Sequence, residues 1–328
     1  MQQLLRKIGF EVEFTCPVDP LPLIDGYLRD IGQPVVHYGS YRHSDGIHWD
    51  LKRDSSCGYE IASPIVDTYT GLLNAAKIVN IVKRFGGTVN EKCGLHVHVD
   101  LNHITAEDFQ RIMRFMSRYE DSFFLLADKW RQNNQYCRKL NGQAESVKNN
   151  PSDYRHAWNY KHFWLNGTHL RGQGTLEFRL MASHLEAEYI IGWTLFLVHT
   201  IDYLLKGKTV SWGQAKCASD RDLLQTMLGQ AGFYGPFDNR DKPTIVAARK
   251  WALGTYTAKV GQDDRRIKVP TMEQLASISE TPVDPSTSMD RQLAAVASPA
   301  PRRRAARVRR SATTGRQWPP MDTGVHGS

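Results

Sequence analysis

Apolar and polar residues alternate along three separate segments of the chain. Residues 8–14 alternate strictly and lead into a proline-rich stretch, which predicts a strand followed by a loop. Residues 94–101 and 174–182 alternate in the same way and predict two further strands. Residues 48–66 mix aromatic, charged and β-branched side chains around a short turn, which is typical of a hairpin or of two short strands.

Helical spacing of apolar residues marks the longer segments. Residues 71–85 show this spacing and stop at two glycines, which is a C-terminal helix signal. Thr105 with Asp108 predicts a capping box at the start of a second helix, and residues 186–205 predict a long buried helix. Residues 129–160 are polar and predict a long loop.

The order of these elements predicts an α+β fold, because long helices separate the strands without regular strand–helix–strand repeats. We expect a core domain over residues 1–210 and a small helical appendage over residues 211–270. Over residues 271–328, Ser, Pro, Ala and Arg dominate and apolar periodicity disappears, so a disordered basic tail is expected.

Composition narrows the class of protein. The chain has 328 residues, of which 41% are hydrophobic, so it can bury a large core and global disorder is excluded. The formal net charge of +8 is uneven, because eight arginines and three aspartates follow residue 280 and the rest is nearly balanced. The basic charge therefore says little about an active surface on the core.

The cysteines and the N-terminal residues predict the compartment. Five scattered cysteines without a C-x-x-C pair argue against a disulfide framework and against a cysteine zinc site. The N-terminal residues show no long apolar region and no cleavage site, and the most apolar segment, residues 189–205, is shorter than the ~20 residues a bilayer requires. We therefore expect a cytoplasmic protein with no membrane contact, in which the glycosylation pattern at Asn166 has no meaning.

Ionisable side chains stand two residues apart on each predicted strand. The pairs are Glu11 with Glu13, His96 with His98, Glu177 with Arg179 and, more loosely, Asp54 with Glu60. On a strand this spacing puts both side chains on one face. Any single pair is explained by the solvent-exposed face of an antiparallel sheet, which often carries charged residues. If all these groups share one face, however, the arrangement costs free energy unless divalent cations and a phosphate balance the charges.

The residue types favour a particular cation. Several carboxylates with few imidazoles favour Mg²⁺ or Mn²⁺ over zinc. Mg²⁺ usually shares a substrate's phosphates, and the guanidinium of Arg179 suits bidentate contact with a phosphate. We therefore predict a nucleotide–metal site on a sheet face. A phosphate-cradling loop is not expected, because Gly207-Lys208-Thr209 lacks the leading glycine of a Walker motif.

Six motifs follow one another in order over residues 8–205. They are Gly9-Phe10-Glu11-Val12-Glu13-Phe14, Trp49 with Asp54-Ser55-Ser56, Tyr59-Glu60-Ile61-Ala62-Ser63-Pro64, Cys93-Gly94-Leu95-His96-Val97-His98-Val99-Asp100, Tyr119-Glu120 and Gly174-Thr175-Leu176-Glu177-Phe178-Arg179. This ordered set resembles the amidoligase family, which is grouped with the glutamine synthetase-like and glutamate–cysteine ligase-like carboxylate–amine ligases. Ser55 and Ser183-His184 depart from the residues usual in the family, at a turn and at the rim of the expected site.

The resemblance implies a fold and a reaction. The fold would be a curved antiparallel sheet that forms part of a split barrel, backed by helices, with ATP and two or more Mg²⁺ ions on its concave face. ATP would phosphorylate a carboxylate, and an amine would displace phosphate from the acyl phosphate to give an amide or isopeptide bond. The substrates could be amino acids, peptides, or protein or cell-wall peptide ends.

The resemblance also implies roles for single residues. The metal ligands would be Glu11, Glu13, Glu60, His96 and Glu177. The residues that contact ATP would be His98, Arg179 and Arg131, although ordinary loop polarity explains Arg131 equally well. Arg179 and Asp54 are the catalytic candidates: Arg179 would neutralise the transferring phosphoryl group, and Asp54 would be a ligand or would orient the amine.

Two other classes of function stay open. His-x-His followed by acidic residues also suits a dinuclear metal-dependent hydrolase, which needs no nucleotide. The arginine-rich residues 302–310 could contact nucleic-acid backbones through non-specific electrostatics, although such a run is more often a solvated terminus. No oligomeric state is predicted.

Overall fold

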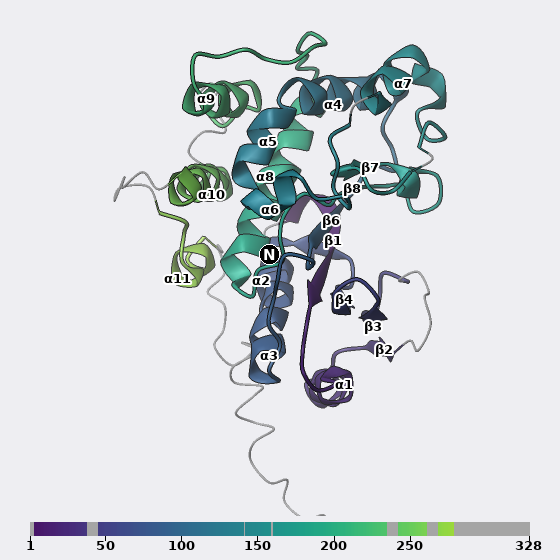
Figure 1. Cartoon of the computed structure of the whole chain (residues 1–328), viewed down its shortest axis with the longest axis vertical. Helices are drawn as coiled ribbons and strands as arrows, with labels where there is room; N and C mark the ends of the chain where they lie inside the picture. Colours follow the sequence, from purple (N-terminus) through teal and green to yellow (C-terminus); the bar gives the residue numbers. More distant parts are fainter. Residues whose placement is uncertain are drawn as a thin grey trace, which may run out of the picture.

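An eight-stranded sheet with helices packed against it forms the frame of the chain (Figure 1). The computed structural model describes residues 3–37, 45–140, 142–158, 160–234, 242–260 and 268–278. The predicted α+β class is confirmed, with an open and mostly antiparallel sheet.

The strand β1 lies at the centre of the sheet. The strands are β1 (Gln3–Phe14), β2 (Val35–His37), β3 (Trp49–Asp54), β4 (Gly58–Ala62), β5 (Val66–Thr68), β6 (Leu95–Asp100), β7 (Leu165–Asn166) and β8 (Thr175–Phe178). Their order is β2-β3-β4-β1-β6-β8-β7, and β5 also pairs with β1. Among the described strands, β2 pairs with β3 in parallel and the other pairs are antiparallel.

The register of the central strands sets their ionisable residues side by side. Glu11 pairs with His96 across β1 and β6, and Glu13 pairs with Glu60 across β1 and β4. On the next pair, His98 of β6 lies opposite Glu177 of β8. Directly opposed residues share a face, so side chains far apart in the sequence meet on one side of the sheet.

The opposite face of the sheet is apolar. Phe10, Val12 and Phe14 of β1 are buried, as are Val97 of β6 and Phe178 of β8. The helix α8 (Ala187–Leu205) packs against β1 and β6. Burying each such side chain contributes about 1.5–3 kcal/mol, so the alternation of residues decides which face the charged groups take.

Further helices surround this layer. They are α2 (Tyr69–Ala76), α3 (Ile78–Arg84), α4 (Ala106–Arg118) and α5 (Glu120–Leu126). The single helix expected over residues 71–85 is wrong, because the chain breaks at Lys77 and forms two helices. The capping box of α4 is confirmed: the Asp108 N–H donates to Thr105 Oγ1 over 3.1 Å, and the Thr105 N–H donates to Asp108 Oδ2 over 2.9 Å.

Two segments expected to be loops contain helices. The helix α1 (Leu21–Asp30) replaces the loop expected after the first strand, and it begins directly after Pro20. The polar segment 129–160 contains short helices instead of one continuous loop. They are α6 (Lys129–Gln132), α7 (Gln143–Asn149) and the 3₁₀ turn η1 (Pro151–Asp153).

The C-terminal helices lie on the side of α8 away from the sheet (Figure 1). They are α9 (Asp220–Gln230), α10 (Pro243–Val260) and α11 (Met272–Ala276). The helix α10 packs along α8, where the rings of Trp193 and Trp251 lie 5.6 Å apart. The segment expected as an appendage therefore shares a hydrophobic core with residues 1–210.

The expected start of the disordered tail at residue 271 is wrong. The helix α11 forms there, with a capping box at Thr271, and Leu275 is buried. The Tyr69 hydroxyl donates to the Leu275 carbonyl oxygen over 2.6 Å and ties α11 to α2. Residues 279–328, which hold the arginine-rich run, lie outside the described residues. Within the described part, none of the helices combines the length and apolarity needed to cross a membrane.

Candidate functional site

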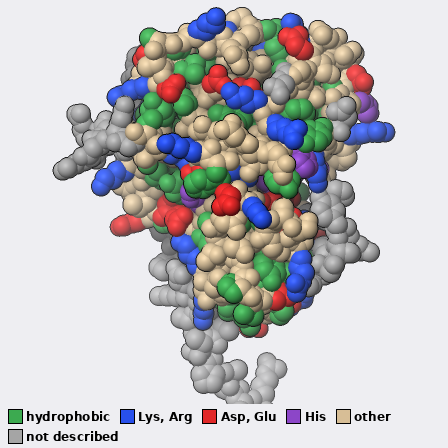
Figure 2. Space-filling view, in the orientation of Figure 1, with side chains coloured by type: hydrophobic (Ala, Val, Ile, Leu, Met, Phe, Trp, Pro, Cys, Tyr) green, Lys and Arg blue, Asp and Glu red, His purple; other side chains and the backbone are tan. Residues whose placement is uncertain are grey.

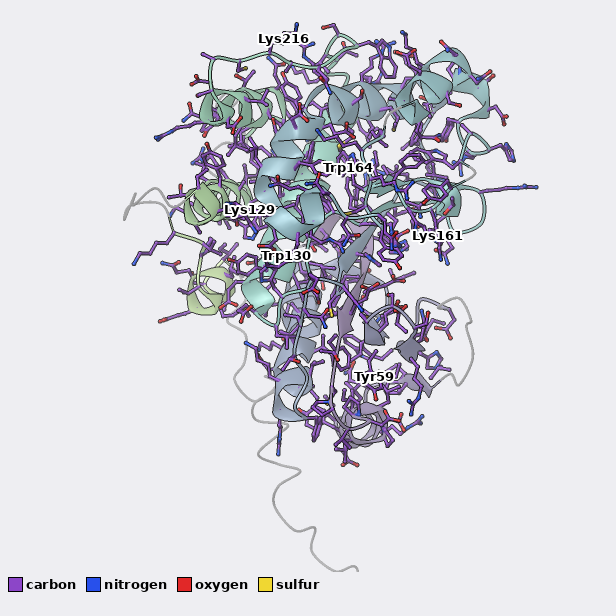
Figure 3. All side chains as sticks on the ribbon, in the orientation of Figure 1. Tyr59, Lys129, Trp130, Lys161, Trp164 and Lys216 are labelled. Carbon is purple, nitrogen blue, oxygen red and sulfur yellow. The ribbon has the colours of Figure 1, made fainter. Side chains whose placement is uncertain are left out.

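A cavity of about 1020 Å³ opens on the polar face of the sheet. Its walls include the ionisable residues Glu11, Lys52, His98, Glu177 and Arg179. Lys161 also lines it and lies on the side of the molecule where β7 and β8 lie (Figure 3). Elsewhere on the surface, side chains of both charges are spread over the face seen in Figure 2. The cavity therefore gathers four of the predicted site residues, Glu11, His98, Glu177 and Arg179.

A first cluster of possible ligand atoms joins three strands. Glu11, His98 and Glu177 each offer one atom, and these atoms lie within 4.8 Å of one another. His98 Nε2 lies 3.7 Å from Glu11 Oε1, while His98 Nδ1 lies 3.2 Å from the Thr175 hydroxyl. If Nδ1 carries the proton and donates it to Thr175, the Nε2 lone pair is left facing the carboxylates, as metal ligation requires.

A second cluster lies on the other side of β1. Glu13, Asp54 and Glu60 bring one oxygen each within 4.8 Å of one another. The Gly94 N–H donates to Glu13 Oε2 over 2.6 Å, and Lys52 Nζ donates to Glu60 Oε1 over 2.9 Å. Asp54 Oδ1 accepts the N–H groups of the turn that joins β3 to β4, so the turn fixes this carboxylate.

His96 stands between the two clusters. Its Nδ1 lies 3.0 Å from Glu11 Oε2 and 3.5 Å from Glu177 Oε1, and its Nε2 lies 3.6 Å from Glu13 Oε1. Only 3% of its side chain is exposed. Burial, together with the nearby Arg179 charge, lowers the pKa of His96, so this imidazole adds no positive charge at neutral pH.

The second cluster holds three carboxylates, and Lys52 pairs with one of them. Burial raises the pKa of Glu13 to about 8; the charges of Glu60 and Asp54 add to the rise, and the Gly94 N–H opposes it. Burial also raises the pKa of Glu60 to about 7; the Glu11 charge adds to the rise, and the Lys52 ammonium opposes it. Carboxylates that hold protons near neutral pH are suited to a divalent cation, which would supply the missing charge.

Glu177 has the opposite environment. Burial disfavours its charge, but the Arg179 guanidinium and a hydrogen bond from His169 hold the pKa of Glu177 well below its usual value. Arg179 Nη1 donates to Glu177 Oε1, and Arg179 Nε lies 3.4 Å from the Tyr136 carbonyl oxygen. The guanidinium is therefore held at the cavity wall beside the first cluster.

The donor set fits Mg²⁺ or Mn²⁺. Both clusters are dominated by carboxylate oxygens, with one imidazole in the first, and the described residues place no thiol in either cluster. Hard oxygen ligands suit these ions, whereas zinc sites are richer in imidazole and thiolate. The residues expected as metal ligands lie in these clusters or, for His96, between them.

Two predicted residues, His98 and Arg131, take other positions than expected. His98, expected to contact phosphates, stands among the possible metal ligands, as does Asp54, for which a ligand is one of the two expected roles. Arg131 is only 1% exposed, and its guanidinium donates to the carbonyl oxygens of Leu180 over 3.1 Å and Arg179 over 2.5 Å. It supports the backbone behind β8 and is not part of the cavity wall.

Sequence reasoning missed several ionisable residues of the cavity, among them Lys52 and His169 beside the two clusters. Lys52 stands two residues before Asp54 on β3, so the same spacing rule would have found it. His169, in the 3₁₀ turn η2 (Thr168–Leu170), lies with its Nε2 3.4 Å from Glu177 Oε2 and its ring centroid 5.1 Å from that of His98. It gives no periodic signal, because it reaches the site from a loop.

Comparison with protein families finds a match over part of the chain. Residues 38–159 match the family described as "Putative amidoligase enzyme". The resemblance predicted from the motifs is thereby confirmed over these residues, which include Asp54, Glu60, His96 and His98. The first and last site strands, β1 and β8, lie outside the match.

Among the solved structures that match the chain is one of a ligase complex. It is the crystal structure of the complex between the prokaryotic ubiquitin-like protein Pup and its ligase PafA, with a TM-score of 0.38 and 10% sequence identity. The alignment covers 89% of this chain and 63% of that chain, so this chain spans less than two thirds of its length. Among curated proteins, none matches the sequence.

Proposed function

We propose that this chain is an ATP- and Mg²⁺-dependent carboxylate–amine ligase that forms an amide or isopeptide bond. The observation that carries the proposal is the pair of carboxylate clusters on either side of His96, the first of which lines one cavity together with Arg179. The family match over residues 38–159 supports the same class of reaction. We also propose that the sheet forms part of a split barrel and that the protein is cytoplasmic. The five free cysteines support a reducing compartment.

Each cluster would hold one divalent cation. Glu11, His98 and Glu177 would bind the first ion, and Glu13, Asp54 and Glu60 the second. When bound, the ions supply positive charge for the phosphates of ATP; Mn²⁺ would serve in place of Mg²⁺. Neutral His96 would donate its single N–H to Glu11 of the first cluster, and its other ring nitrogen would face Glu13 of the second.

The reaction proceeds in two displacements. A substrate carboxylate oxygen attacks the γ-phosphorus, and the bond from that phosphorus to the ADP oxygen breaks. The amine then attacks the acyl carbon, loses a proton, and phosphate leaves with its bonding electrons. Arg179 would face the phosphoryl group as charge moves between the two oxygens, where a fixed guanidinium lowers the barrier most.

The cavity supports a reaction with more than one substrate. Its volume of about 1020 Å³ lies at the upper end of ligand pockets, which measure roughly 300–1000 Å³. A nucleotide and a carboxylate or amine could occupy it together. We propose an amino acid, peptide or protein end as the acceptor, because the cavity is open to solvent beside exposed residues such as Ile65.

The direct test is ADP release with Mg²⁺ in the presence of amino acids, amines and peptide mixtures, followed by mass spectrometry. A ligase releases ADP only with a suitable pair and yields a product lighter by one water than its two substrates. Glu13→Gln should abolish the release, while Glu145→Gln on the surface of α7 should not. ATP-independent hydrolysis of a substrate would instead support the metal-dependent hydrolase.

A further inference from the structure

Asn166 lies at the buried end of β7, opposite Glu177 of β8. Its exposed fraction is 0%, so the Asn-Gly-Thr pattern that resembles a glycosylation site is inaccessible in the fold. Asn166 Nδ2 donates to Glu177 Oε2 over 2.5 Å, and Asn166 Oδ1 accepts the Thr168 N–H over 3.0 Å. Both ends of this amide are therefore in use.

These two hydrogen bonds decide which way the amide points. A backbone N–H can only donate, so the atom facing Thr168 must be the oxygen. The NH₂ group must then face the Glu177 carboxylate, and its hydrogen bond fixes the position of Glu177 Oε2. The other oxygen, Oε1, faces the site, where it lies 3.5 Å from His96 Nδ1 and accepts from Arg179.

The loop after Asn166 is built closely around this carboxylate. A Cβ on Gly167 would lie 2.2 Å from the ring of Trp158, so only glycine lets the chain pass there. Two residues later, His169 brings Nε2 to 3.4 Å from Glu177 Oε2. The His169 carbonyl oxygen accepts the Gln173 and Gly174 N–H groups, which closes the loop back onto β8.

We propose that Asn166 is a positioning residue that orients Glu177 for a divalent cation. The inference rests on the proposed function, since it takes Glu177 as a metal ligand. Carboxylate ligands are usually held by a hydrogen bond on the oxygen that does not face the metal, and loss of such a partner weakens metal binding by about 10- to 100-fold. Asn166 supplies that hydrogen bond from the buried end of β7.

The test is Mn²⁺ binding to the purified full-length protein, measured by electron paramagnetic resonance of free Mn²⁺ without nucleotide. Asn166→Asp keeps an oxygen for the Thr168 N–H, removes the donor to Glu177 and adds a carboxylate beside it. Asn166→Leu removes both hydrogen bonds without adding charge. We expect both variants to bind at least one Mn²⁺ ion about 10- to 100-fold more weakly than the parent protein.

Trp164→Phe is the matched control. Trp164 Nε1 donates to the buried carboxylate of Glu120 over 2.7 Å, next to β7 but outside the cavity. This variant should lower the midpoint of urea unfolding and leave Mn²⁺ affinity within about twofold, because Glu120 is in neither cluster. It separates a loss of stability from a loss of ligand orientation.

The outcomes separate this inference from the proposed function. If the parent protein binds Mn²⁺ and both Asn166 variants bind it equally well, the positioning role is wrong while the ligase proposal stands. If Asn166→Leu fails to fold, the Mn²⁺ affinity of Asn166→Asp decides. If the parent protein binds no Mn²⁺, both the positioning role and the metal-dependent function are overturned.

Discussion

At the scale of single residues, the site depends on which carboxylates are paired with the positively charged side chains near them. Arg179 is the guanidinium of the cavity wall and is already paired with Glu177. Lys52 is paired with Glu60 in the other cluster. Because each cation stands beside one cluster, changing either should alter the chemistry more than the fold.

Arg179→Lys tests the geometry of this charge. Lysine keeps the positive charge but loses the planar fork, so we expect turnover to fall by more than nucleotide affinity does. The two quantities are the rate of ADP release at saturating ATP and the dissociation constant of ATP. Arg171→Lys, at an exposed position, should change neither. Unchanged turnover of Arg179→Lys would remove Arg179 from the phosphoryl site.

Gly94→Ala tests how tightly the second cluster is packed. A Cβ there would lie 2.9 Å from His96 Nε2 and 3.3 Å from Glu13 Oε2, so His96 and Glu13 must move. We expect Mn²⁺ binding and ADP release to fall at least tenfold in a protein that still folds. Gly229→Ala in α9 meets nothing within 4 Å and should stabilise the fold by about 0.5–1 kcal/mol without affecting activity. Full Mn²⁺ affinity in Gly94→Ala would show that the cluster is not preorganised.

At the scale of elements, alternation along the strands was the most reliable signal. It predicted the site strands β1, β6 and β8 and the face on which their ionisable residues lie, because one misplaced register would bury charge in the core. It could not predict which carboxylates would group together. That depends on the pairing of β1 with both β4 and β6, which no local pattern encodes.

The missed elements have local physical reasons. The helix α1 begins between two prolines, at positions 20 and 22, which read as a loop although proline is tolerated in a first helical turn. The three-residue β2 is too short to show alternation and is defined by its pairing with β3. The helix α11 carries one buried leucine, and its stability comes from packing on α8 and α2.

The capping box of α4 gives a prediction for an element away from the cavity. Thr105→Ala removes the acceptor for the Asp108 N–H, so the free energy of unfolding should fall by about 1 kcal/mol. Urea unfolding measures the change, and Thr105→Ser should retain most of the stability because its hydroxyl keeps the acceptor. Mn²⁺ affinity should be the same in all three proteins. If Thr105→Ala had the same free energy of unfolding as the parent protein, the cap would contribute nothing to stability.

At the scale of the whole molecule, the C-terminal helices are part of one core with the sheet. The rings of Phe196 in α8 and Phe233 after α9 stack 5.2 Å apart, and Trp251 in α10 lies against Phe196. His199 of α8 is buried in this layer, with its ring 4.5 Å from that of Phe233. Composition indicated a small separate appendage, but these aromatic contacts couple its stability to that of the site.

His199 makes the stability of this core depend on pH. Burial lowers the pKa of His199 from 6.5 to about 4, with Asp202 opposing the change and Lys206 adding to it. Above pH 6.5 the imidazole is neutral in both the folded and the unfolded chain. Below pH 6.5 His199 becomes protonated in the unfolded chain, whereas in the folded chain it stays neutral until about pH 4. The free energy of unfolding therefore decreases as the pH falls from 6.5 to about 4.

His199→Gln is the matched variant, since it removes the titration. We expect the free energy of unfolding of the parent protein, relative to this variant, to fall by about 3 kcal/mol between pH 7 and pH 4. Urea unfolding at several pH values measures both proteins, so the titration of carboxylates cancels in the difference. A difference that does not change with pH would mean that His199 is protonated equally in both states.

Anomalous diffraction from crystals grown with Mn²⁺ and a non-hydrolysable ATP analogue tests the central claim most directly. The account predicts two manganese peaks, one within roughly 2–2.5 Å of oxygens of Glu11 and Glu177 and one within the same distance of oxygens of Glu13 and Glu60, with His96 between them and the terminal phosphate beside Arg179. Manganese and nucleotide bound elsewhere, with both carboxylate clusters empty, would contradict it.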